Sequence, residues 1–442
     1  MSTRNALSRH PGWATGISCV GLRPASSSGG SGGPSVTVEV TSDATSDATP
    51  DATSDARGDT GVELIEGFRA RELVSLHGSP LMVLDCGRVR AQYRRLAAAL
   101  PGVDLHFAIK ALPHSAVIST LSGEDSYFDF SSRGELALLT SLAISSARAI
   151  NTHPIKQERD IRDSLQYGCE TFVVDNAAEI EKFARYRDRV SLLLRIGFRS
   201  EDAEVDLAKK FGCAVDDVFP LLDLAKRLGL RILGLSFHVG SQCGSPRAFV
   251  EAINDCRLLI ERARLARLAD IGVLDIGGGF PVAYATEAAP PSIESFCAPI
   301  RAALAGIPPQ IRVTAEPGRF LVAPAMDAIA TVIGKARRGD SFWYYLDDGV
   351  YGSFNGRVYD PTVRYPLQAI SQSAGAHSVS VLAGPTCDSI DVIGENLWLP
   401  ELQIGDLLVG SLMGAYTMGS ASEFNSIPKT KILVVNGPET TT

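Results

Sequence analysis

The sequence predicts an α/β protein in which a closed (β/α)8 barrel of the TIM type is followed by a C-terminal β-sandwich or β-barrel domain. Between residues 104 and 318, eight strand-length apolar segments alternate with helix-length amphipathic segments. Continuous apolar strands separated by helices are typical of a parallel sheet covered on both faces. A count of eight favours a closed barrel, although an open doubly wound sheet gives a similar pattern.

The barrel strands are expected at DLHFAIK (104–110), SYFDFSS (126–132), ARAINT (147–152), TFVVDN (171–176), SLLLRIG (191–197), ILGLSFHV (232–239), VLDIGGGF (273–280) and RVTAEPG (312–318). Intervening segments such as FVEAINDCRLLIERARLARL carry apolar residues at i, i+3, i+4 and i+7, which is one face of a helix. After about Pro324, the runs FWYYLDD, SVSVLAG, DLLVGSL and KILVVNG predict the strands of the β domain. The segment PLMVLD (80–85) precedes the barrel and is expected to pair with that domain.

The first 60 residues contain SSSGGSGGPS and a recurring Ser-Asp-Ala-Thr pattern. Such a segment buries too little apolar surface to offset the entropy of ordering it, so it predicts a disordered tail. Arginines and serines without an acidic residue before Glu39 leave an organelle transit peptide as the alternative. We therefore expect a tail at 1–60, a strand segment at 61–85, the barrel at 86–323 and the β domain at 324–442.

The charge and composition of the chain disfavour several classes of protein. The net charge of −8 disfavours nucleic acid as a partner. The apolar runs are far shorter than the ~18–20 residues that a membrane span needs. Eight dispersed cysteines without a CxxC pair favour reduced thiols and a cytoplasmic location. The seven histidines include no pair at helical ligand spacing, so no metal is expected.

Polar residues and glycines lie where the predicted barrel strands end, which is where barrel enzymes carry their functional groups. In chain order these residues are Lys110, Asp129, Glu135, Arg195, His238, Ser241, Gly278, Gly279, Glu316 and Arg319.

Together these residue types suit a phosphorylated aldehyde cofactor. A lysine amine forms a Schiff base with a carbonyl, and a Gly-Gly-Gly turn brings backbone N–H groups to a phosphate, with Ser241 and Arg319 as further phosphate contacts. A carboxylate such as Glu316 keeps a pyridine nitrogen protonated, and His238 can stack on the ring. Each residue alone has a plainer explanation: a surface lysine, a tight βα turn, a salt bridge or a core histidine.

Nine motifs then occur in order: HFAIKA, FDFSSRGEL, LSFHVGSQC, LDIGGGFP, AEPGRF, DDGVYGSFN, YDP, GPTCDSID and GAYTMGSASEFN. Over about residues 62–435 the chain resembles the eukaryotic-type ornithine decarboxylases, within the alanine-racemase-like (fold III) enzymes that use pyridoxal 5′-phosphate (PLP). The resemblance implies PLP-dependent decarboxylation of a basic amino acid. It favours L-ornithine, with putrescine and CO2 as products in polyamine biosynthesis.

The resemblance also implies roles for particular residues. Lys110 matches the Schiff-base lysine, Glu316 the partner of the pyridine nitrogen, and His238 the ring-stacking histidine. The residues that match the phosphate-binding set are Ser241, Gly278, Gly279, Arg319 and Tyr416. Residues similar to those that support the cofactor are Asp129, Glu135 and Arg195. Cys387 is similar to the proton-donating cysteine, and Asp360 and Asp388 to the acids that hold the distal amine of the substrate.

The resemblance further implies a homodimer with shared active sites. The second subunit would supply Cys387, Asp388 and Tyr416, and Lys210 would pair with Asp391 across the interface.

Other substrates and activities stay open. Ser389 replaces the usual glycine after Cys-Asp, and PTVRYPLQ replaces a histidine-containing run, so lysine or a related diamino acid remains the alternative substrate. Diaminopimelate decarboxylases typically carry Cys-Glu-Ser here, and fold III racemases place an arginine at the pyridine nitrogen, unlike Glu316. Catalytically silent regulatory homologues typically lose cofactor-binding or catalytic residues, whereas this chain retains Lys110 and Cys387.

Overall fold

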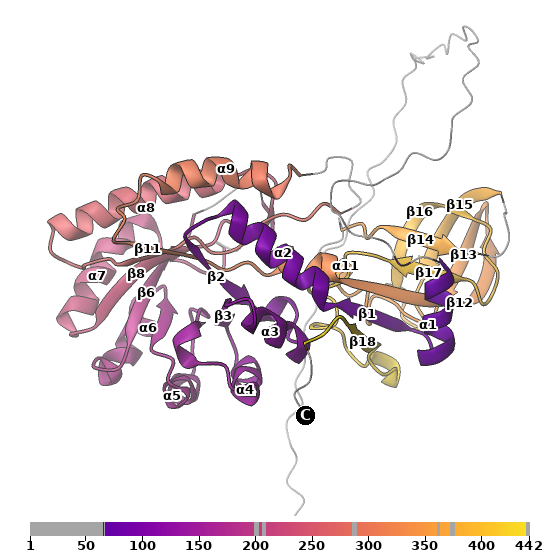
Figure 1. The fold of residues 1–442 in the computed structure, drawn as a ribbon, viewed down its shortest axis with the longest axis horizontal. Helices are drawn as coiled ribbons and strands as arrows, with labels where there is room; N and C mark the ends of the chain where they lie inside the picture. Colours follow the sequence, from indigo (N-terminus) through magenta and orange to yellow (C-terminus); the bar gives the residue numbers. More distant parts are fainter. Residues whose placement is uncertain are drawn as a thin grey trace, which may run out of the picture. The chain divides into compact units, whose positions relative to one another are not determined.

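Eight parallel strands form a closed barrel that follows the first strand of the chain. Figure 1 draws this barrel with the helices around it. The computed structural model describes residues 65, 67–198, 203–205, 209–284, 290–359, 363–371 and 376–438. The expected tail at 1–60 and Asp360 lie outside the described residues. The barrel and the separate sheet that follows it confirm the predicted fold class.

Each expected barrel strand is present in the expected order. The strands are β2 (Val103–Ala108), β3 (Tyr127–Phe130), β4 (Ala149–Asn151), β5 (Thr171–Val174), β6 (Ser191–Ile196), β8 (Arg231–Phe237), β10 (Val273–Asp275) and β11 (Arg312–Ala315). The barrel closes because β11 pairs with β2 in parallel, with Val313 opposite Val103. Closure leaves no sheet edge and gathers the carboxyl ends of all these strands at one rim.

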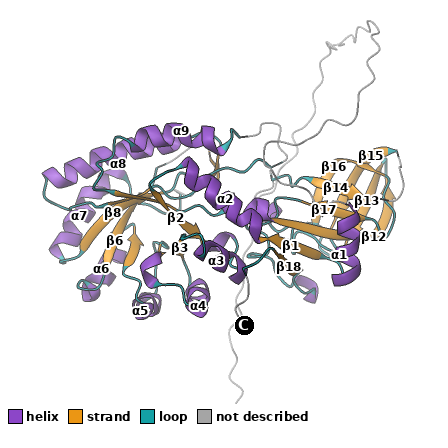
Figure 2. Cartoon of the chain, in the orientation of Figure 1, coloured by secondary structure: helices purple, strands orange, loops and turns teal. Residues whose placement is uncertain are grey.

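Helices lie outside the barrel strands (Figure 2). They are α2 (Cys86–Ala99), α3 (Ser115–Ser122), α4 (Arg133–Ser141), α5 (Glu158–Tyr167), α6 (Ala177–Phe183), α7 (Val218–Arg227), α8 (Arg247–Leu265) and α9 (Ile293–Leu304). Side-chain caps define several starts: Ser132 accepts a hydrogen bond from the backbone N–H of Glu135, and Asn176 accepts one from Glu179.

Helix α8 illustrates why the amphipathic segments pack as they do. Its buried residues, Phe249, Ala252, Ile253, Cys256, Leu259, Ile260 and Ala263, recur at the spacing of one helical face. The Phe249 ring stacks on Phe280 at a centroid distance of 5.2 Å and meets the edge of Phe296 at 6.0 Å. The helix is thereby held against the turn that follows β10.

The second sheet has eight strands, with a main path in the order β14-β17-β12-β13-β15-β16. Its members are β1 (Leu81–Asp85), β12 (Met326–Arg338), β13 (Ser341–Leu346), β14 (Leu367–Ile370), β15 (His377–Ala383), β16 (Val392–Pro400), β17 (Leu407–Gly410) and β18 (Lys431–Val435). Strand β1 pairs antiparallel with β12 and parallel with β18, so the segment ahead of the barrel lies in this sheet.

Short elements complete the described chain. They are α1 (Gly67–His77), α10 (Arg319–Val322), α11 (Gly356–Tyr359) and a two-stranded ribbon of β7 (Ala203–Val205) with β9 (Ser241–Cys243). An ion pair ties α2 to β12, with Arg88 Nη1 2.9 Å from Asp327 Oδ2. Among the helices described, none has the length and apolar character needed to cross a bilayer.

Candidate active site

The carboxyl ends of the barrel strands bring together titratable side chains that are far apart in sequence. Strand β2 leads directly into a 3₁₀ turn, Ile109–Ala111, that carries Lys110. Asp129 lies in β3 and Arg195 in β6, while His238 and Glu316 follow β8 and β11 immediately. The parallel barrel therefore places the five residues on one rim.

The amine of Lys110 is the centre of this group. Its Nζ lies 3.4 Å from Asp129 Oδ2, and its side chain keeps 41% of its surface exposed, so a ligand can reach it. Asp129 is 1% exposed, and its other oxygen accepts a hydrogen bond from Thr152. The enclosing protein lowers the pKa of the Lys110 amine, but the negative charges of Asp129, Tyr416 and Glu316 outweigh that effect and raise it. Asp129 thus holds this amine in place.

The pKa of Glu316 is strongly raised, and the pKa of His238 is strongly lowered. Burial, followed by the facing carboxyl of Asp275, raises the pKa of Glu316 well above its usual range. Burial, with Arg195 and Lys110 nearby, lowers the pKa of His238 far below its usual range. The imidazole is therefore neutral, and its Nδ1 accepts a hydrogen bond of 3.0 Å from the N–H of Gly240.

A cradle for an anion lies beside these groups. Arg319 donates to Ser241 Oγ at 3.3 Å and to the Tyr284 hydroxyl at 3.0 Å, and its guanidinium lies 4.9 Å from the centre of the Tyr416 ring. Among the described residues, no acceptor bonds the buried Arg319 Nε, so a donor remains for a ligand.

The glycine turn after β10 adjoins this cradle and admits no side chain. A Cβ on Gly278 would approach the backbone oxygen of Glu316 to 2.6 Å, and Gly279 has a φ of +115°. A fixed cation, hydroxyls and a side-chain-free turn are what a phosphate group requires. The residues present therefore fit a phosphorylated aldehyde such as PLP, because an anion cradle at Arg319 and an accessible amine at Lys110 lie at the same rim.

Tyr416 belongs to the site of its own chain. Its backbone N–H donates to the oxygen of Ala111 at 2.9 Å, and its ring faces Arg319. The expectation that a second subunit supplies Tyr416 is therefore wrong.

Cys387 and Asp388 lie apart from this cluster, on the loop after β15. The exposed thiol of Cys387 accepts a hydrogen bond of 3.2 Å from Asn425 Nδ2. Asp388 Oδ2 accepts one of 2.5 Å from the Tyr351 hydroxyl, which lowers the pKa of that carboxyl. The Tyr351 ring stacks on Phe424 at 4.4 Å.

Asp391 is buried and accepts several hydrogen bonds within its own chain. It is 2% exposed, its Oδ1 accepts from the N–H of Val350 at 2.9 Å, and its Oδ2 accepts from Thr386 N and Oγ1 at 3.0 and 2.7 Å. It therefore fixes the loop that carries Cys387. Lys210 lies 5.0 Å over the Phe211 ring of its own chain, and its pair with Asp391 across two subunits stays a prediction.

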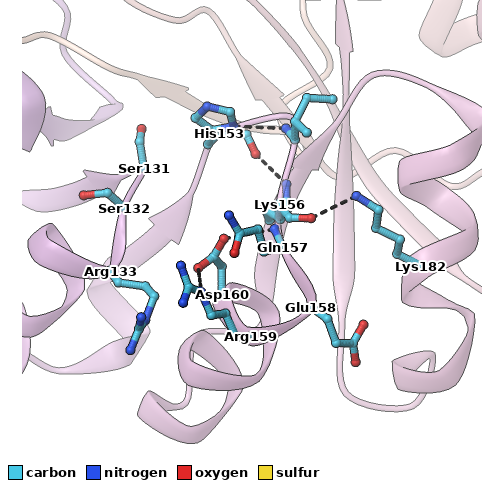
Figure 3. Close-up of a pocket in the computed structure, with 11 residues that line it drawn as sticks. Ser131, Ser132, Arg133, His153, Lys156, Gln157, Glu158, Arg159, Asp160 and Lys182 are labelled. Carbon is cyan, nitrogen blue, oxygen red and sulfur yellow. Dashed lines mark hydrogen bonds and ion pairs between the residues drawn. The ribbon is translucent and has the colours of Figure 1, made fainter. Parts of the chain in front are cut away.

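A hollow of about 740 Å³ opens beside the rim, between the segments that follow β3 and β4 (Figure 3). Its charged groups already have partners. Lys156 donates to the backbone oxygens of His153 and Val173, both at 2.5 Å, and Lys182 pairs with Glu179. The charged side chains around this hollow are therefore already bound within the protein. The described residues also include no group of three or more His, Cys, Asp or Glu that could hold a metal ion.

Sequence reasoning missed several residues that contact the expected ones: Asp275, Thr152, Tyr284, Tyr351 and Asn425. Asp275, Tyr351 and Asn425 lie within motifs quoted above, LDIGGGFP, DDGVYGSFN and GAYTMGSASEFN. Membership of a motif gave no indication of which side chain each would face.

Comparison with known proteins agrees with this geometry. Residues 86–323 match the model of the pyridoxal-dependent decarboxylase family, pyridoxal binding domain. The fold and the site thus define a fold III PLP-dependent decarboxylase. The chain belongs to the family of pyridoxal-dependent ornithine and lysine decarboxylases, and its cofactor is PLP.

Similar proteins differ in the substrate their names give. The chain is 35% identical to a lysine/ornithine decarboxylase of Selenomonas ruminantium (78% of this chain, 87% of the relative). It is 33% identical to the ornithine decarboxylase of Mus musculus (84% and 86%) and to antizyme inhibitor 2 of Xenopus laevis (83% and 85%). The lysine/ornithine decarboxylase of Vibrio vulnificus, solved with cadaverine, has a TM-score of 0.79 and 48% identity (84% of this chain, 96% of that one).

Glu135 yields a prediction about stability and pH. Ser131 N donates to its Oε2 at 2.6 Å, yet burial raises the pKa of Glu135 from 4.5 to about 7. A raised carboxyl pKa contributes stability below pH 4.5 that is lost as the pH rises through about 7. The free energy of unfolding of the cofactor-free protein should therefore fall by on the order of 3 kcal/mol as the pH rises through this range. Glu135→Gln should remove this fall.

Urea unfolding at pH 5 and pH 8 measures this difference. Glu294→Gln is the matched control, because hydrogen bonding to Arg95 lowers the pKa of Glu294 to about 2 and its contribution changes only at lower pH. An unchanged pH slope in Glu135→Gln would contradict the expectation.

Proposed function

We propose that the enzyme decarboxylates L-ornithine to putrescine and CO2, with lysine as the alternative substrate. The observation that carries the choice of a diamino acid is the Asp388 carboxylate, held by the Tyr351 hydroxyl at 2.5 Å. A fixed negative charge suits an ammonium at the end of a substrate side chain. The relatives named for lysine and ornithine support a terminal amine as the recognised group.

In this proposal the barrel rim holds PLP. Lys110 binds it covalently, Glu316 faces its pyridine nitrogen, and the neutral imidazole of His238 lies against its ring. Its phosphate is bound by Ser241, Gly278, Gly279, Arg319 and Tyr416. The cofactor, when bound, supplies an electron sink for the pair released with CO2.

The remaining residues hold or move protons. Asp129 fixes the Lys110 amine, with its own carboxylate oriented by Thr152. Glu135 and Arg195 complete the charge environment of that amine. The Cys387 thiol delivers a proton to the α-carbon from which CO2 has left, which requires a positioned acid. Asn425 keeps this sulfur in place.

We also propose a cytoplasmic homodimer with shared sites. Within one chain, Cys387 and Asp388 contact Asn425 and Tyr351 and not the group around Lys110. A second copy related by twofold symmetry would bring its Cys387 loop over the rim. The dispersed cysteines of the sequence are consistent with a reducing compartment.

The substrate can be tested directly. We expect kcat/KM for ornithine to exceed that for lysine by about 5-fold to 100-fold, because one methylene in a pocket is worth ~1–3 kcal/mol. Tyr351→Phe should raise KM for both by roughly threefold to tenfold, since Asp388 loses its hydrogen bond. Tyr167→Phe, whose hydroxyl bonds the oxygen of Ile144 away from the rim, is the control. A preference for lysine would overturn the choice of ornithine.

Subunit mixing tests the shared site. Lys110→Ala and Cys387→Ala proteins should each be nearly inactive in amine production, but a mixture should regain about one quarter of wild-type activity, because each heterodimer has one intact site. Amine release after co-refolding gives the measurement. If the mixture stays as inactive as its components, Lys110 and Cys387 act within one chain and the shared site is refuted.

A further inference from the structure

Asp275, which has no role in the function proposed above, faces Glu316 inside the barrel. It is 0% exposed at the end of β10, and its Oδ1 accepts a hydrogen bond of 2.9 Å from the N–H of Gly277. Its Oδ2 has no donor among the described residues, and the carboxyl of Glu316 is the group beside it. Glu316 is itself only 8% exposed.

Two facing carboxyl groups in the protein interior can hydrogen-bond to each other only when one of them is protonated. When both are ionised, each is an acceptor only and the two repel one another. When one holds a proton, it donates to the other and the pair carries a single negative charge. Burial raises the pKa of both carboxyls, to about 6 for Asp275 and well above the usual range for Glu316, in agreement with one proton held between the two groups.

The surrounding charges agree with a single shared proton. The cations facing the pair are Lys110 and Arg195, and the other nearby anion is Asp129. With one proton on the pair, two cations meet two anions. With none, three buried carboxylates would face two cations. His238 is neutral and does not change this balance.

The neighbours of Asp275 across the sheet carry no charge that could take the proton. Asp275 pairs in register with Ser236 of β8 and Thr314 of β11. Residues in register on adjacent strands share a face of the sheet. The hydroxyls of Ser236 and Thr314 are buried and have no hydrogen-bond partner in the described part of the chain. Asp275 therefore lies in an uncharged layer directly beneath Glu316.

We propose that Asp275 is a positioning residue that shares one proton with Glu316, so that the pair presents a single, oriented negative charge to the pyridine nitrogen of PLP. This inference rests on the proposed role of Glu316. A purely structural role for Asp275, as the acceptor for Gly277, would require no proton.

The test detects the proton itself. The infrared C=O stretch of a protonated carboxyl is measured at pH 7.5 in the Glu135→Gln background, which removes the other carboxyl whose pKa lies near 7. We expect Asp275→Asn to lose one such band, in both the cofactor-free protein and the holoenzyme. Asp406→Asn is the control, because Asp406 Oδ2 accepts from Gln403 N and Ser371 Oγ at 2.8 and 2.7 Å and needs no proton of its own.

Cofactor affinity gives a second readout. Asp275→Asn retains a donor toward Glu316 and should bind PLP within about threefold of wild type, whereas Asp275→Leu, of similar size, should bind it about tenfold more weakly or worse. An unaltered carboxyl band in a folded, PLP-binding Asp275→Asn protein would overturn the proposal, as would wild-type affinity in Asp275→Leu. If Asp275→Asn loses the band but the wild-type enzyme decarboxylates no amino acid, the proposed function is refuted and the shared proton is not.

Discussion

The constraint on which the site depends is the placement of three buried carboxyls against two cations at one end of a closed barrel. Asp129 and Asp275 lie in β3 and β10, and Glu316 directly follows β11. Lys110 lies in the 3₁₀ turn after β2, and Arg195 lies in β6. Such a set is costly to bury unless its charges balance. The pairing of β11 with β2 closes the barrel and so brings Glu316 to the same rim as Lys110.

Two kinds of backbone segment form this rim, and each positions a different set of groups. Strand ends and the short turn at Lys110 fix the side chains that act on an aldehyde and a ring. The glycine turn after β10 and the start of α10 supply the anion cradle, because Arg319 is the first residue of that helix. The opposed pKa shifts of Glu316 and His238 follow from the same burial, which penalises whichever form is charged.

The sequence predicted the barrel well because each strand is a short apolar run followed by a polar residue or glycine. It missed β12, whose segment MDAIATVIGKARR is rich in alanine and ends in three cations among its last four residues. That strand forms because β1, β13 and β17 all pair with it. Tertiary pairing, which no local pattern reveals, decides its structure.

The same limit applies to the site. Lys110, Asp129 and Glu316 could be found because barrel topology gathers strand ends. Asp275 could not, because an acid two residues before a turning glycine is explained by the hydrogen bond it makes to Gly277. Only the fold places its second oxygen against Glu316. Tyr416 was assigned to the wrong subunit because a residue over 300 positions from Lys110 gives no sign of which chain it serves.

The most direct test of this account is to load the protein with PLP, reduce it with borohydride and map the labelled peptide. The account predicts one stable adduct per chain, on the peptide that contains Lys110. An adduct on another lysine, such as the buried Lys156, or no adduct at all in a protein that binds PLP, would contradict it.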